Sequence, residues 1–161
     1  MMRIAISLVT ALVLSSCGDD SEMAMDFPPT STINGEVPPG RMYPLVDVIT
    51  MLDTITADGD RLVITRGVRL AGTRVGIHVH EYGGQTCVIS GTITDFVEGQ
   101  EPAVFPEGTC YYMPPNTPMS AANLEDVPAI LIDTFKVPPG APVITVIEPG
   151  WQEVVEEAGL Q

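Results

Sequence analysis

Two histidines that stand two residues apart carry the clearest chemistry in this chain. His78 and His80 are its only histidines, in the run Gly72-Thr-Arg-Val-Gly-Ile-His-Val-His. In an extended strand, side chains two apart point to the same face. Two imidazoles on one face are the start of a site for a divalent or copper ion. The alternative is that both are hydrogen-bonded residues of a protein interior.

A second run, over residues 108–123, repeats the pattern of a turn, a strand and another turn. It contains Met119, whose thioether is either a soft metal ligand or a filler of the core. Tyr82, Tyr111, Tyr112 and Asn123 are candidates for the wall of a small-molecule pocket, with packing on a strand face as the alternative for the tyrosines. The chain contains no nucleophile elbow, phosphate loop or dinucleotide fingerprint.

Short β-rich runs separated by turn signals make up most of the chain. The predicted strands are 45–50, 61–65, 68–70, 73–80, 86–90, 92–97, 109–113, 120–123, 129–137 and 143–147. Many short strands with Gly and Pro between them predict an all-β sandwich or small barrel. Within a C-terminal tail of 151–161, residues 151–158 are a candidate for a short helix.

The two runs resemble the paired motifs of the cupin superfamily, a double-stranded β-helix of the jelly-roll class. The positions that match its motifs are Gly72, His78, His80 and Gly91 in the first run, and Gly108, Pro114, Asn116, Met119 and Asn123 in the second. The resemblance covers about residues 45–137. It implies a cupin-type jelly-roll barrel, which we expect to occupy residues 33–150.

The departures from the family pattern concern the metal ligands. A typical cupin site has three His and one Glu. The family's Glu position falls on Gly84 or Gln85, depending on the direction of counting, and its third His position falls on Met119. The resemblance therefore implies a reduced set of His78, His80, Gln85 and Met119, which suits a copper-like ion better than iron or manganese. Glu81 is an alternative carboxylate if the strand ends at His80.

The first 17 residues resemble a bacterial lipoprotein signal. A positive start is followed by an apolar run over residues 4–14 and by Leu14-Ser-Ser-Cys17. This implies that Cys17 is the lipid attachment site, that residues 18–32 form a flexible acidic tether, and that the protein is exported to the cell envelope, at the outer membrane or periplasmic face. The alternative is an ordinary secretory signal cleaved nearby.

Export also bears on the two remaining cysteines, because the compartments outside the cytoplasm are oxidising. We expect Cys87 and Cys110 to form a structural disulfide. The alternative is a pair of buried free thiols.

The net charge of −14, from 7 basic and 21 acidic side chains, argues against nucleic acid as a partner, because such binding depends on Lys and Arg. Three functions remain open. The first is a tethered cupin-like domain that binds a small ligand or a metal ion in the barrel. The second is a metal-dependent dioxygenase or isomerase that uses His78 and His80. The third is a structural or interaction protein, for which the resemblance implies a homodimer.

Overall fold

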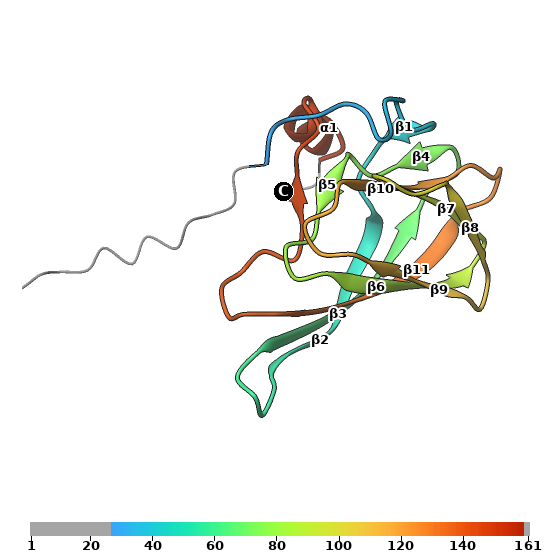
Figure 1. Ribbon diagram of the computed structural model, residues 1–161. Helices are drawn as coiled ribbons and strands as arrows, with labels where there is room; N and C mark the ends of the chain where they lie inside the picture. The colour runs from blue at the N-terminus through green and yellow to red at the C-terminus, as the bar shows by residue number, and fades with distance from the viewer. Residues whose placement is uncertain (1–26, 160–161) are drawn as a thin grey trace, which may run out of the picture.

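The computed structural model describes residues 27–159, and nearly all of the regular structure in this range is β (Figure 1). The elements are β1 Arg41–Met42, β2 Val46–Ile55, β3 Arg61–Arg69, β4 Thr73–Arg74, β5 His78–Val79, β6 Gly84–Ser90, β7 Thr92–Val97, β8 Ala103–Pro106, β9 Cys110–Met113, β10 Met119–Asn123, β11 Ala129–Val137, β12 Thr145–Val146 and α1 Trp151–Glu157. The predicted signal peptide, Cys17 and the first part of the predicted tether lie outside the described residues.

Two sheets form the barrel. In one, the strand order is β2-β3-β11-β6-β9; in the other it is β1-β4-β10-β5-β12, with β7 between β10 and β8. Every pair of these strands is antiparallel except β1 with β4. Figure 1 shows the two sheets enclosing one interior, with α1 outside it and the β2–β3 hairpin extending beyond it. The predicted all-β, jelly-roll architecture is confirmed.

Strict alternation along the strands selects the residues of the interior. In β7, Ile93, Asp95 and Val97 are buried, while their neighbours are only partly covered. β9 buries Tyr111 and Met113 and exposes Cys110 and Tyr112. The alternate positions of β6 and β11 and Met119 of β10 complete one apolar core, which consists of Val88, Ile93, Val97, Tyr111, Met113, Met119, Ala129, Leu131, Phe135 and Val137. Burial of these side chains is the main favourable contribution to folding.

The predicted strand 73–80 is wrong as a single element, because the chain leaves the ladder between β4 and β5. A Cβ at Gly76 would lie 2.9 Å from both the Trp151 ring and the Val146 side chain, so only glycine fits this close approach. The backbone groups of Ile77 bond instead to the segment after β12: its N–H donates to the Glu148 carboxylate, and its carbonyl accepts from the amides of Ile147 and Glu148. The interruption is therefore fully hydrogen-bonded at Ile77.

The charge that this arrangement buries is neutralised by an ion pair. The Arg74 guanidinium donates to both carboxylate oxygens of Glu148 at 2.5 and 2.7 Å, and both side chains are almost fully buried. Two parallel N–H···O bonds give such a pair a fixed geometry. The ion pair therefore fixes the position of the C-terminal segment against β4.

Removing the negative member of this pair should be strongly destabilising. We expect Glu148→Gln to lower the free energy of unfolding by about 3–5 kcal/mol, because it leaves the Arg74 charge buried without a partner. Urea unfolding followed by tryptophan fluorescence would measure the change. Glu107→Gln, on an exposed turn, should have an effect within about 0.5 kcal/mol, and equal losses in the two variants would contradict this account.

The described end of the predicted tether lies against the barrel. The Thr30 amide donates to the Ile147 carbonyl at 3.2 Å, and Ile33 is buried. The Asn34 amide donates to the Glu98 carboxylate at 2.7 Å. Residues 30–34 therefore make fixed contacts, so any free tether ends before Thr30.

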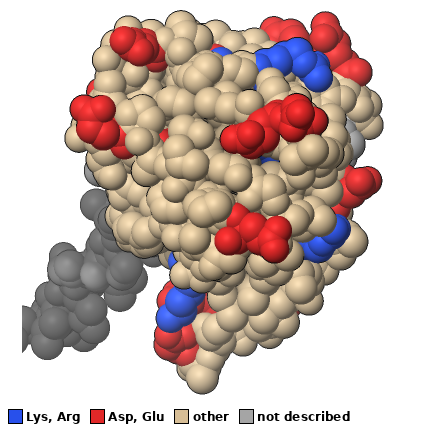
Figure 2. Space-filling view, turned by 90° about the vertical axis from the view of Figure 1, so that its right-hand side faces the viewer, with Lys and Arg blue, Asp and Glu red and all other residues tan. Residues whose placement is uncertain are grey.

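The surface agrees with a solvated acidic protein. On the face shown in Figure 2, Asp and Glu side chains form separate clusters with uncharged surface between them, and few basic side chains accompany them.

The edge strand β2 exposes large apolar side chains at Val48, Ile49, Met51 and Ile55. No helix within residues 27–159 is long and apolar enough to cross a membrane.

Candidate functional site

The two histidines meet inside the barrel. His78 lies in β5 and His80 follows directly after that strand, and their Nε2 atoms are 3.1 Å apart. Both side chains are buried. As the spacing predicts, the two imidazoles share one face.

The two imidazoles have no proton left for a hydrogen bond between their Nε2 atoms. The Nδ1 atom of His78 is 2.8 Å from the Gly76 carbonyl, and that of His80 is 2.5 Å from the Val143 carbonyl. A carbonyl only accepts, so each Nδ1 carries a proton in these bonds. Two neutral imidazoles have no further proton, and their Nε2 lone pairs therefore face each other. Burial, with a smaller effect of the neighbouring His80, lowers the pKa of His78 to about 3, so a third proton is not held near neutral pH.

This geometry fits a metal ion. Imidazole nitrogens bind metals at about 2.0–2.1 Å, so one ion can reach two nitrogens that are 3.1 Å apart. Met119 is the register partner of His78 on β10 and lines the same cavity as both histidines. It also belongs to the apolar core. Within residues 27–159, no group of three or more His, Cys, Asp and Glu side chains is placed to hold a metal ion.

The predicted fourth ligand, Gln85, is wrong. Gln85 is exposed on β6, where the alternation that turns Thr86 inward turns Gln85 outward. The other candidate position, Gly84, has no room for a side chain: a Cβ there would lie 2.7 Å from the Phe135 ring and 2.9 Å from the Met113 methyl group. The Phe135 ring stacks on His80, with the ring centroids 5.0 Å apart. An apolar ring therefore occupies the space beside the histidine pair that a carboxylate ligand would need.

All the predicted pocket residues except Tyr111 are also placed elsewhere. Tyr82 is 45% exposed and Tyr112 is 65% exposed, and neither lines the cavity that holds the histidines. In β9, Tyr111 is the inward residue. Asn123 is buried, but its amide donates to the carbonyls of Arg69 and Val127 and its oxygen accepts from the Glu125 amide. It supports the turn before β11 and does not line the cavity.

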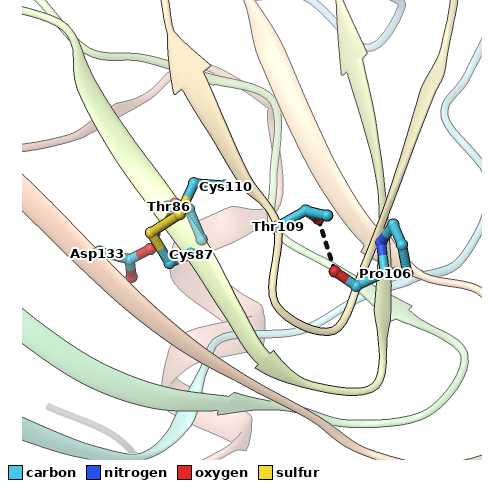
Figure 3. Close-up of a disulfide and its surroundings, with 6 residues drawn as sticks. All are labelled: Thr86, Cys87, Pro106, Thr109, Cys110 and Asp133. Carbon is cyan, nitrogen blue, oxygen red and sulfur yellow. Dashed lines mark hydrogen bonds between the residues drawn. A yellow bond between two sulfur atoms is a disulfide. The ribbon is translucent and has the colours of Figure 1, made fainter.

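Cys87 and Cys110 are bonded to each other and are register partners on β6 and β9 (Figure 3). Because both point to the outer face, their neighbours Thr86 and Tyr111 point into the barrel. The turn before β9 is closed by the Thr109 hydroxyl, which donates to the Pro106 carbonyl at 2.6 Å. The disulfide thus joins the two strands that present Thr86 and Tyr111 to the interior.

The histidines line a cavity of about 260 Å³ between the two sheets. Its remaining polar wall consists of Thr65, Arg69, Thr86, Asp95, Tyr111 and Asp133. Of these, the sequence singled out only Tyr111. A signal for them exists in the sequence. Asp95 stands between Ile93 and Val97, and Asp133 between Leu131 and Phe135, at inward positions of strands whose other inward residues are apolar. Charged residues at such positions indicate function or buried pairing.

Burial changes the protonation of these groups. It raises the pKa of Asp95 to about 7, and it raises the pKa of Asp133, whose carboxylate accepts a 2.6 Å hydrogen bond from Thr86. The pKa of Tyr111 is raised well above its usual value by the same cause. Burial lowers the pKa of Arg69 to about 10, which still leaves it charged near neutral pH. The cavity therefore holds a fixed cation and carboxyl groups that resist ionisation.

Asp95 should make stability fall as the pH rises. Between about pH 4 and 7 the native state holds a proton on Asp95 that the unfolded state has lost, so unfolding releases a proton in this window. We expect Asp95→Asn to flatten this dependence, removing a loss of about 2–4 kcal/mol between pH 4 and pH 8. Urea unfolding across this range would measure it, with Asp126→Asn in an exposed loop as the control. The slope with pH is the readout, and an unchanged slope in Asp95→Asn would contradict the prediction.

Comparison with known proteins identifies the fold. No family model matches the chain, and no curated protein matches it. Among solved structures, a double-stranded β-helix protein from Klebsiella pneumoniae subsp. pneumoniae MGH 78578 aligns with a TM-score of 0.50 and 24% identity over 73% of this chain and 89% of that chain. A cupin-like protein from Thermotoga maritima MSB8 aligns with a TM-score of 0.52 and 14% identity over 76% of this chain and 96% of that one. The DMSP lyase DddQ from Ruegeria pomeroyi DSS-3 aligns with a TM-score of 0.51 and 15% identity over 71% of this chain and 58% of that one. The chain therefore has the cupin double-stranded β-helix fold.

Proposed function

We propose that this protein is a cupin-fold binding domain of the cell envelope that takes a metal ion, and a small ligand beside it, inside the barrel. One observation carries the proposal: two buried Nε2 atoms face each other at 3.1 Å while both Nδ1 protons are committed to backbone carbonyls. Lone pairs that face each other repel. A cation between them relieves this repulsion without requiring a third proton.

The ligand set favours a soft ion. His78 and His80 would supply two neutral nitrogens, and Met119 is the candidate for a third, thioether ligand. The position beside His80 that a carboxylate would need is filled by Phe135. Thioether and imidazole ligands without a carboxylate suit copper, and Cu(I) in particular, better than manganese or iron. A bound ion would supply a Lewis-acidic centre at the cavity wall.

Metal titration of the untagged protein tests this proposal. We expect one equivalent of Cu(I) to bind, with Mn(II) binding at least 100-fold more weakly, and we expect His78→Ala to abolish copper binding. Met119→Leu keeps the volume and removes the sulfur, so it should weaken Cu(I) binding about 10-fold or more and leave Zn(II) binding nearly unchanged. Calorimetry with a competing chelator would measure the Cu(I) and Zn(II) affinities.

The exposed Met51 provides the matched control, and Met51→Leu should bind copper like the unmodified protein. Retention of copper by His78→Ala, or binding of no metal at all, would contradict the proposal.

A metal-dependent enzyme of dioxygenase or isomerase type is the second candidate function. It is favoured by the acid–base groups of Asp95 and Tyr111 in the cavity wall that also contains the histidines. Oxygen consumption by protein loaded with Fe(II), lost in His78→Ala, would support it over a binding role.

The envelope location rests on the residues before the barrel. The signal-like segment and Cys17 precede a short acidic stretch, and within the described residues the Thr30 amide already bonds to the barrel at Ile147. We expect the expressed protein to partition into the detergent phase of Triton X-114 and Cys17→Ala to move to the aqueous phase, because the variant cannot receive a lipid. A variant that lacks Cys87 and Cys110 but keeps Cys17 should still enter the detergent phase. The tether proposal fails if Cys17→Ala partitions like the unmodified chain.

A further inference from the structure

A buried arginine faces the barrel cavity without a counter-ion. Arg69 is the last residue of β3, is 3% exposed and lines the cavity. Its guanidinium donates to the Tyr43 carbonyl, but its Nε–H has no partner. The ion pairs formed within residues 27–159 involve Arg61, Arg74 and Lys136, so Arg69 has no carboxylate within 4.0 Å there. A guanidinium that is buried and unpaired destabilises the fold unless an anion reaches it.

The carboxyl groups of the same cavity do not fill this role. Asp133 accepts its short hydrogen bond from Thr86 and lies beyond ion-pair distance of Arg69. Asp95 lies on β7 in the opposite sheet, and its Oδ1 atom is buried without any hydrogen-bond partner. The cavity therefore presents one unmet donor, the Arg69 Nε–H, and one unmet acceptor, the Asp95 carboxyl, from opposing sheets.

The rest of the wall limits the kind of molecule that fits. Apolar side chains dominate it, among them Leu45, Val48, Val75, Leu131, Val143 and Ile144. The volume of about 260 Å³ lies just below the usual range of ligand pockets. A small molecule with an apolar body and one charged end matches this combination.

We propose that the cavity binds a small monocarboxylate with an apolar body, whose carboxylate pairs with Arg69 and whose body packs on the apolar wall. A planar guanidinium matches a carboxylate through two parallel hydrogen bonds. A hydroxyl or amine on such a ligand can donate to Asp95 Oδ1, which otherwise has no hydrogen-bond partner. This inference rests on the proposed role of the barrel as a ligand site, but not on metal binding.

Binding of defined acids to metal-free protein tests the inference. The probes are acetate, 4-methylpentanoate and benzoate, each paired with its neutral amide, in the presence of a chelator, with binding followed by NMR titration. We expect 4-methylpentanoate and benzoate to bind, acetate to bind more weakly because it lacks the apolar body, and the three amides to bind at least 10-fold more weakly than their acids.

Variants of two arginines on β3 distinguish a specific role of Arg69 in binding the carboxylate from a general effect of positive charge. Arg69→Met should weaken the binding of the acids about 10- to 100-fold, as expected for the loss of a charge-assisted pair. Arg69→Lys keeps the buried charge and should bind with intermediate affinity. Arg66→Met removes the same charge from the opposite face of β3, since Thr65 lines the cavity, and should bind like the unmodified protein.

The outcomes distinguish this inference from the metal proposal. Binding of acids without metal that is lost in Arg69→Met and retained in Arg66→Met supports the inference, whatever the copper titration shows. Acids that bind only to the metal-loaded protein, or that bind equally well in Arg69→Met, would overturn it and leave the metal proposal standing. The inference also fails if none of the three acids binds.

Discussion

The ion pair between Arg74 and Glu148 is the interaction on which the placement of the histidines depends. One carboxylate accepts from the Arg74 guanidinium and also from the Ile77 amide, in the gap between β4 and β5. This allows the chain to leave the ladder at Gly76, whose carbonyl then orients the His78 ring. A continuous strand would have used these backbone groups for pairing. The buried charges therefore stabilise an irregular segment that the arrangement of the histidine pair requires.

The barrel interior contains several buried polar side chains in addition to its apolar core. The core cluster and the cavity share side chains such as Met119 and Phe135, and the cavity adds the imidazoles, Arg69, Asp95 and Asp133 to this apolar lining. Each of these polar groups loses solvation on folding, and two of them, Arg69 and Asp95, keep atoms without partners. Such groups weaken the fold when nothing is bound. Their gathering around one cavity is typical of a ligand site, where the missing partners come from the ligand.

Short β-rich runs and turn signals predicted an all-β sandwich or barrel, and the resemblance of the two motifs to cupins predicted its type, while the site was predicted only in part. Strands such as β7 and β11 were visible as β-rich runs, and the spacing of the two histidines placed them on one face. Gln85 and Tyr112 were chosen by motif counting and by side-chain type, and both point outward because the strand register, which sequence spacing alone does not fix, turns them so. Arg69 and Asp95 were missed because their meaning depends on which strands lie opposite each other. Only the folded sheets show that the two share a cavity.

The net charge of the cavity depends on two features: no carboxylate lies beside the histidines in the position of the family's Glu ligand, and Arg69 is present. In a site with a carboxylate ligand, the protein itself offsets part of the charge of a dication. Here Phe135 fills that place, and Arg69 places a positive charge in the same cavity. Metal and arginine together would repel unless the buried carboxyl groups ionised or an anion entered. A carboxylate ligand removes this conflict, since it neutralises Arg69 directly and lowers the potential at the histidine pair. Metal and anion binding should therefore reinforce each other, by the reciprocity that any coupling between two sites obeys.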